Sequence, residues 1–172
     1  MELILKGKCW KFGDNLSNDV EILPLAAVKE LGRTMEIFKD HLLINVNPEF
    51  PKKVRAGDII VAGKRFGHGN IHIWGYHALK EIGVGLIVES IARGGLRNAV
   101  AAGIPFLPAV ESITKKVSQG DELEVNFKTG EIKNLTTNEL IKAEPLPQPL
   151  LEIIEAGGQQ GFLEKKFAGS PS

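Results

Sequence analysis

The segment Phe66–His77 combines residue types that are well suited to binding and catalysis. Gly67 and Gly69 lack a Cβ atom, so backbone N–H groups around them can approach a ligand closely. We expect a helix to begin just after these glycines with Asn70 as its N-cap, and a helix N-terminus favours an anion such as a carboxylate. A Gly-x-Gly sequence before a helix is also typical of an ordinary turn. The segment therefore predicts either an anion-binding loop or a structural turn.

Three of the four histidines, His68, His72 and His77, belong to this segment. Imidazole titrates near neutral pH, so His68 and His72 are candidate general acids or bases. A metal site is not expected, because His72 and His77 would point to different sides of a helix. No carboxylate lies between His68 and His77 to complete a set of ligands. Solvent-facing or hydrogen-bonded histidines are the structural alternative.

A second polar group begins at Arg93, at the start of another expected helix. Its guanidinium group could bind a carboxylate through two parallel hydrogen bonds. A solvated helix start, with Arg97 paired on the surface, is the alternative. The polar loop Asp14–Asp19 follows the first expected strand, and its residue types are also common in turns.

Alternating strands and helices are expected to position these residues. Continuous apolar runs at 58–62, 84–88 and 104–107 are typical of strands buried on both faces. Helices are expected between them, one from the glycine turn to about Ile82 and one over Arg93–Ala102. This order predicts parallel strands with right-handed crossovers. Ligands bind at the carboxyl ends of such strands, where both polar groups would lie.

The two ends of the chain show other patterns. The expected elements are strands over Met1–Trp10 and Asp121–Phe127, a return strand from Ile132 after a turn at Lys128–Glu131, and helices over Pro24–Gly32 and Leu150–Ala156. Residues 165–172 are expected to form a frayed tail. The stretch 33–51 contains apolar residues with no dominant period. The sequence thus predicts one mixed α/β domain over residues 1–172, with a parallel core flanked by antiparallel hairpins.

Composition excludes several classes of protein. The 172 residues include 21 Lys and Arg and 21 Asp and Glu, so a strongly basic nucleic-acid binder or a chain attracted to membranes by bulk charge is not expected. Cys9 is the only cysteine, which rules out an intrachain disulfide and an iron–sulfur cluster held by this chain alone. No apolar run is long enough to span a membrane, and the start lacks the pattern of a signal peptide. We therefore expect a cytoplasmic protein.

Several motifs together identify a family resemblance. They are Trp10–Asn15, Val54–Gly67, Glu89–Ser90, Arg97–Ala99, Gly103–Pro105, Gly130–Leu135, Ala143–Pro147 and Leu151–Gly158. In these motifs the chain resembles the small subunit of 3-isopropylmalate dehydratase, and the match is weakest between Val20 and Val46. The resemblance implies a swivelling β/β/α three-layer domain of the aconitase superfamily.

The resemblance also implies a partner. In this family the small subunit closes over a large subunit that carries a four-iron–four-sulfur cluster, and the pair dehydrates and rehydrates a hydroxy-polycarboxylic acid. That chemistry requires a base that removes a proton next to a carboxylate, a Lewis-acidic iron and arginines that bind carboxylates. The single Cys9 agrees with a cluster held by the partner. Alone, the subunit could also form a homo-oligomer.

The chain departs from the family pattern at the glycine loop. The family loop reads Gly-x-Gly-Ser-Ser-Arg-Glu-His-Ala, and alignment through Ala78–Lys80 places Asn70 and Ile71 at the two serines. His72 falls at the arginine. No serine alkoxide can therefore form, and His72 would be a shorter, titratable substitute for the guanidinium group.

Two arginines remain as expected carboxylate contacts. Arg93 aligns with a family arginine, although Gly94 and Gly95 replace bulky apolar residues after it. Arg33 lies in the region Leu23–Thr34, where the resemblance places the substrate-specificity loop.

These observations define a candidate site and leave more than one function open. The candidate catalytic residues are His68, Asn70 and His72, and the candidate substrate-binding residues are Gly67, Gly69, Arg33 and Arg93. The chain could be a hydro-lyase subunit whose altered loop accepts a different hydroxy acid. It could instead be a regulatory or non-catalytic paralogue that docks on the large subunit without turnover. A stand-alone isomerase is a third possibility.

Overall fold

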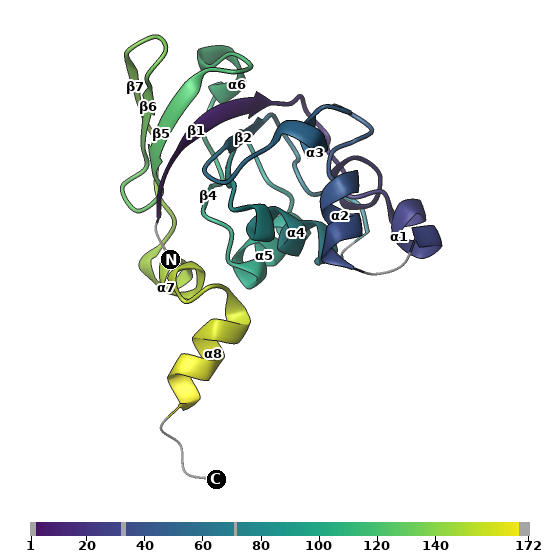
Figure 1. Ribbon diagram of the computed structural model, residues 1–172. Coiled ribbons are helices and arrows are strands. Elements are labelled where there is room, and N and C mark those ends of the chain that lie inside the picture. Colours follow the sequence, from purple (N-terminus) through teal and green to yellow (C-terminus); the bar gives the residue numbers. More distant parts are fainter. Residues whose placement is uncertain (1–2, 32–33, 71, 169–172) are drawn as a thin grey trace.

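The computed structural model describes residues 3–31, 34–70 and 72–168. Seven strands form one curled sheet in the order β4-β3-β2-β1-β5-β6-β7 (Figure 1). The strands are β1 (Ile4–Lys11), β2 (Ile59–Ala62), β3 (Gly85–Val88), β4 (Phe106–Leu107), β5 (Glu122–Asn126), β6 (Glu131–Asn134) and β7 (Glu139–Lys142). β1 to β4 pair in parallel and β1, β5, β6 and β7 pair antiparallel, so the sheet has a parallel half and an antiparallel half.

Most helices connect the strands of the parallel half or extend from it. They are α1 (Leu25–Leu31), α2 (Met35–His41), α3 (Phe50–Lys53), α4 (Trp74–Ile82), α5 (Arg93–Ala102), α6 (Ile113–Lys116), α7 (Gln148–Glu155) and α8 (Gln159–Phe167), with one π-helical turn at Asn18–Ile22. Among the described helices, none is long and apolar enough to cross a membrane.

The parallel half forms the densest part of the core. Every residue of β2 and β3 is buried, because helices and loops cover both faces of these strands. The crossover helices α4 and α5 end at Gly83 and Gly103, whose φ angles of 86° and 80° are readily adopted only by residues without a Cβ. These stops return the chain directly to the next strand.

β1 joins the two halves. Its residues Cys9–Lys11 pair with β2, whereas Ile4–Lys8 pair with β5. The buried carboxylate of Asp58 lies at this junction, where it accepts hydrogen bonds from the backbone N–H of Lys8 (2.9 Å), the indole N–H of Trp10 (2.9 Å) and the backbone N–H of Arg55 (3.0 Å). One side chain thus ties β1 to the turn before β2.

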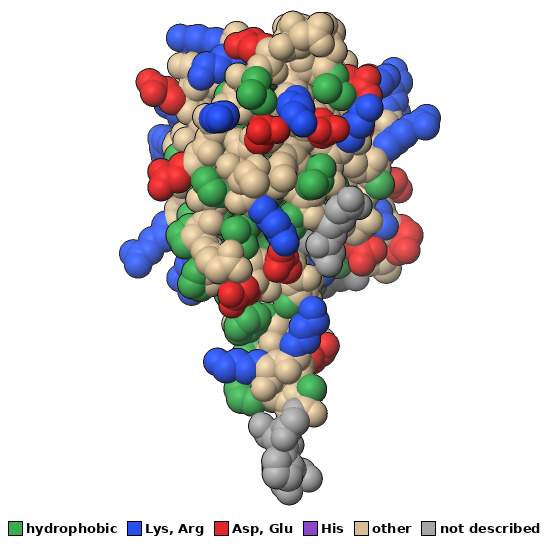
Figure 2. Space-filling view, turned by 90° about the vertical axis from the view of Figure 1, so that its left-hand side faces the viewer, with side chains coloured by type: hydrophobic (Ala, Val, Ile, Leu, Met, Phe, Trp, Pro, Cys, Tyr) green, Lys and Arg blue, Asp and Glu red, His purple; other side chains and the backbone are tan. Residues whose placement is uncertain are grey.

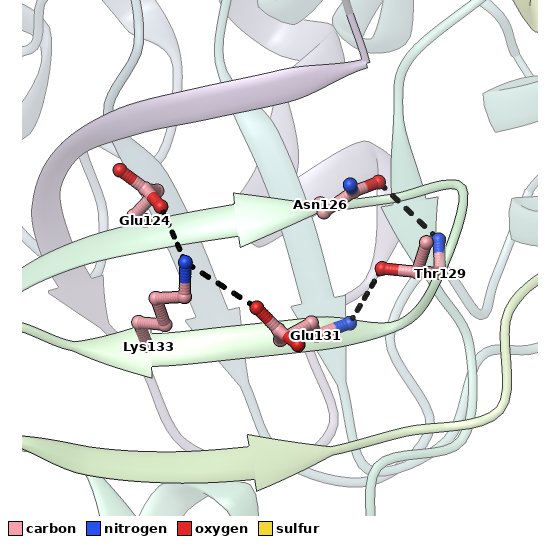
Figure 3. A network of polar contacts seen from close by, with 5 residues as sticks. All are labelled: Glu124, Asn126, Thr129, Glu131 and Lys133. Carbon is pink, nitrogen blue, oxygen red and sulfur yellow. Dashed lines mark hydrogen bonds and ion pairs between the residues drawn. The ribbon is translucent and has the colours of Figure 1, made fainter.

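The antiparallel half has one buried face and one polar face. Leu123, Val125 and Ile132 point into the core, as the alternation of the sequence predicts. On the outer face, the Lys133 ammonium lies 3.0 Å from the Glu124 carboxylate and 3.3 Å from that of Glu131 (Figure 3). This face is therefore solvated rather than covered by another layer.

The last helix extends away from the body. α8 forms a narrow projection in both overall views (Figures 1 and 2). Two of its apolar side chains, Leu163 and Phe167, are 44% and 57% exposed. The expectation of a frayed tail from residue 165 is wrong for Lys165–Phe167, which continue α8; residues 169–172 lie outside the described part of the chain.

The expected mixed α/β architecture, with a parallel core and antiparallel hairpins, is confirmed. One expectation needs correction. The helix after the glycine loop begins at Trp74 rather than near Asn70. No element was predicted for the stretch 33–51; its described part contains α2, and α3 begins at its end.

Candidate functional site

The loops that follow β1, β2 and β3 meet at the carboxyl ends of the parallel strands. Two isolated bridges, Ser17 with His68 and Phe66 with Ile91, continue the parallel pairing beyond the strands. The polar loop Asp14–Asp19 therefore lies beside the glycine loop. The sequence predicts that the glycine loop and the segment at Arg93 lie at one edge of the sheet, and the bridge of Phe66 with Ile91 agrees with this; the position of the polar loop was not predicted.

The buried side chain of Asn18 fixes the position of the glycine loop. Its side-chain amide donates to the carbonyl of Gly67 (3.0 Å), and its side-chain oxygen accepts from the Tyr76 hydroxyl (2.9 Å). The backbone N–H of Asn18 also donates to the carbonyl of His68 (2.8 Å). Asn18 and Tyr76 are each 1% exposed, so these bonds are shielded from water.

The Tyr76 hydroxyl occupies a space that two glycines leave free. A Cβ atom at Gly67 would lie 2.2 Å from this hydroxyl, and one at Gly95 would lie 2.9 Å from it. Burial raises the pKa of the Tyr76 phenol well above its ordinary value, so the group acts as a neutral hydrogen-bond donor. Tyr76 and Asn18 were not among the candidate site residues; the small residues Gly67 and Gly95 were the only sign of a large neighbour.

His68 lies half-buried above this network and is hydrogen-bonded. Its Nε2 is 3.0 Å from the carbonyl oxygen of Asn15. The adjacent Asp14 carboxylate accepts from the backbone N–H of Lys64 (2.7 Å), which links the same two loops again. The polar loop after β1 thus acts as a support for the glycine loop and is more than a simple turn.

Asn70 is not the N-cap of α4. The residue before the helix is Ile73, which makes no side-chain cap, and the side-chain amide of Asn70 instead donates to Asp19 (2.9 Å). Asp19 also lies close to Gly69, where an added Cβ would be 2.8 Å from its carboxylate oxygen. The negative charge of Asp19 therefore lies beside the glycine loop. The sequence predicts either an anion-binding loop or a structural turn here, and this charge disfavours an anion directly at Gly69.

His72 has an unusual environment. Both ring nitrogens are inaccessible to solvent, and neither has a hydrogen-bond partner among the described residues. Burial lowers the pKa of His72 below its ordinary value, an effect that the Asp19 carboxylate and the backbone of Asn18 partly oppose. A buried polar group without a partner costs about 1–3 kcal/mol, and such groups recur at functional sites.

The structure describes Arg93 and Arg97 but not Arg33. Arg93 is the first residue of α5 and is exposed at the same edge of the sheet. Arg33 lies outside the described residues. Arg97 is exposed, and no ion pair to it is found within the described ranges.

The described residues contain no evident ligand set for a metal. Within residues 3–31, 34–70 and 72–168, no group of three or more His, Cys, Asp or Glu side chains is placed to hold an ion. Cys9 is fully buried in β1, and desolvation, together with the charge of Asp121, raises the pKa of its thiol to about 12. A thiolate is therefore not available at this position near neutral pH.

Comparison with known proteins places the chain in a family. No family model matches the sequence. The chain is 44% identical over 171 residues, 99% of each chain, to a protein of Methanocaldococcus jannaschii named isopropylmalate/citramalate isomerase small subunit. It is 40% identical over 163 residues, 94% of this chain and 96% of the relative, to 3-isopropylmalate dehydratase small subunit 1 of Thermotoga maritima.

A solved structure agrees with these relatives. The crystal structure of 3-isopropylmalate dehydratase from Methanocaldococcus jannaschii superimposes with a TM-score of 0.86 and 32% identity, covering 96% of both chains. Sequence identity and fold thus agree over nearly the whole length. The chain belongs to the family of 3-isopropylmalate dehydratase small subunits.

Proposed function

We propose that this chain works in the cytoplasm with an iron–sulfur large subunit as a hydro-lyase that dehydrates and rehydrates a hydroxy-polycarboxylic acid. A partner subunit and this reaction class are supported by relatives that are 40–44% identical over nearly the whole chain. These relatives are named as small subunits of an isopropylmalate/citramalate isomerase and a 3-isopropylmalate dehydratase. The described residues supply no metal ligand set, so we assign the cluster to the partner. There it would supply a Lewis-acidic iron for the substrate hydroxyl.

His72 is our candidate base. Its neutral imidazole can accept a proton from the carbon next to a substrate carboxylate, and its depressed pKa keeps it neutral near pH 7. The backbone of His72 is fixed, because its carbonyl accepts from the Asn98 side-chain amide (3.0 Å). The ring nitrogens without partners carry this proposal: both are shielded from solvent, so substrate binding must shift the loop to reach them and would then satisfy them.

The other residues of the loop bind and orient in this proposal. Gly67 and Gly69 shape the loop, because the Tyr76 hydroxyl and the Asp19 carboxylate fill the spaces beside them, and Arg93 binds a carboxylate. His68, held at the carbonyl of Asn15, is placed to donate or accept a second proton. Asn70 can contact the substrate only by giving up its bond to Asp19.

Reconstitution tests the proposal. The chain is co-expressed anaerobically with a large subunit from the same organism, and the complex is assayed for dehydration of isopropylmalate, citramalate, malate and homocitrate. We expect turnover of at least one acid. His72→Ala should lower kcat/KM at least about tenfold, or about 1.4 kcal/mol of transition-state stabilisation.

The matched control is His77→Ala, because His77 also has a pKa lowered by burial but lies in α4, outside the loop. It should leave kcat/KM unchanged. Equal kinetics in His72→Ala and the native chain would remove His72 from the site. A stable complex that turns over none of the acids would instead identify a regulatory or non-catalytic paralogue.

A double variant examines the loop directly. Asn70→Ser with His72→Arg should create or raise isopropylmalate activity if this loop alone sets the chemistry. No gain in a folded complex would show that other parts of the site have changed as well.

A further inference from the structure

Arg65 lies in the loop after β2, next to the glycine loop. Its φ angle is +58°, in the left-handed region that residues with a Cβ seldom adopt. Its backbone N–H donates to the hydroxyl of Ser90 (2.9 Å), and the next residue, Phe66, donates to the carbonyl of Ser90 (3.0 Å). The position of Arg65 is therefore fixed against the loop that leads into α5.

The same bonds bring Arg65 close to Arg93. The backbone N–H of Ala92 donates to the carbonyl of Phe66 (2.8 Å). Arg65 immediately precedes one member of this bonded pair, and Arg93 immediately follows the other. The backbones of Arg65 and Arg93 are therefore neighbours, at the carboxyl ends of β2 and β3. Both residues are exposed.

The carboxylates of this edge do not neutralise these arginines. Four carboxylates near this edge accept from uncharged donors: Asp14 from the backbone of Lys64, Asp19 from Asn70, Glu21 from Ser17 and Glu89 from Thr114. Neither Arg65 nor Arg93 forms an ion pair with another described residue. Two positive charges are left available for a ligand.

We propose that Arg65 and Arg93 together bind one carboxylate group of a dicarboxylic acid substrate. The inference rests on the proposed function and names the substrate-binding pair for that site. A neutral imidazole at position 72 cannot make the paired, charged hydrogen bonds of a guanidinium group. The two arginines supply that recognition from the neighbouring loops, which leaves His72 free to accept a proton.

Nuclear magnetic resonance of the full chain tests the pair without requiring turnover. The arginine Nε–H signals are followed during titration with citramalate, a dicarboxylate, and with lactate, a monocarboxylate. Citramalate should shift the signals of both Arg65 and Arg93, and lactate should bind at least about fivefold more weakly. Arg65→Gln should raise the dissociation constant measured at Arg93 at least about fivefold, because one charged partner is lost.

Arg55→Gln is the matched control. Arg55 is also exposed, but it lies before β2, at the opposite edge of the parallel strands, and should not affect binding. Unshifted Arg65 and Arg93 signals, or equal affinity in Arg65→Gln, would overturn the proposal. If citramalate shifts both arginine signals but the complex turns over none of the acids, the proposal that Arg65 and Arg93 bind a carboxylate is supported. The proposed reaction is then refuted.

Discussion

Burial acts on two histidines in the same direction. It lowers the pKa of His72, and it lowers the pKa of His77 with help from the charge of Lys80. Both groups therefore bind a proton less readily in the folded chain than in the unfolded chain, whose histidines titrate near about pH 6.5. This difference links stability to pH.

We expect the free energy of unfolding to be highest above about pH 6.5, where these two histidines are neutral in both states. As the pH falls from about 6.5 through the folded-state pKa values, the unfolded chain takes up protons first and stability decreases. Urea unfolding between about pH 7.5 and about pH 5.5 measures the slope. His72→Gln and His77→Gln should each make the slope shallower; an unchanged slope in both variants would contradict the assignment.

Among the elements, α4 is joined to the network below the glycine loop by the buried Tyr76 hydroxyl, which donates to Asn18. Tyr76→Phe keeps the ring against Phe66, with which it makes an edge contact at 6.4 Å, but leaves the Asn18 oxygen without its donor. We expect a loss of about 1–3 kcal/mol in urea unfolding. Phe127→Leu, a substitution of a buried ring beside Gly85 of β3, serves as a comparison in the same core.

Tyr76→Phe should also change His68, because Asn18 supports the carbonyls of both Gly67 and His68. The imidazole signals of His68 should shift in a nuclear magnetic resonance spectrum, whereas those of His41, whose Nδ1 is 2.8 Å from the carbonyl of Ile37, should not. Unmoved His68 signals would show that the hydroxyl stabilises α4 without positioning the loop.

Elements defined by local patterns were predictable. Arg93–Ala102 is a helix with the expected bounds, because its apolar face and the following Gly103 are both visible in the sequence. β7 was not predicted, since only Ile141 of its four residues is buried and no alternation marks it. α2 was not predicted for a similar reason, as Phe38 is its one buried residue.

The candidate site was predictable in outline only. Parallel strands bring their carboxyl ends together, so the nearness of the glycine loop to the loop before Arg93 followed from topology. The pairing of Asn18 with Tyr76 did not, because 58 positions separate them and either residue alone fits a surface role. The partnerless nitrogens of His72 likewise depend on packing that no local pattern encodes.

At the scale of the whole molecule, Asp58 connects the two halves of the sheet. Asp58→Ala removes the acceptor for Lys8, Trp10 and Arg55, and we expect a loss of about 2–4 kcal/mol because bonds to a charged acceptor are strong. Asp58→Asn keeps one acceptor oxygen and should lose less.

The loss of stability in Asp58→Ala is measured by urea unfolding. Circular dichroism and tryptophan fluorescence are recorded on the same samples. Because β1 belongs to both halves, the two signals should still change in one transition in Asp58→Ala. Two separate transitions would contradict this expectation and show that the halves unfold independently once this carboxylate is lost.

The central place of β1 has a consequence for synthesis on the ribosome. Residues Ile4–Lys11 are synthesised before their partners in β2 and β5, which begin only at Ile59 and Glu122. At about 5–20 residues per second, β5 follows β1 by on the order of ten seconds. During that time β1 exposes free N–H and C=O groups that can pair with a strand of another chain. Protection of nascent β1 by a chaperone should therefore matter more for this protein than for one in which the corresponding strand lies at a sheet edge.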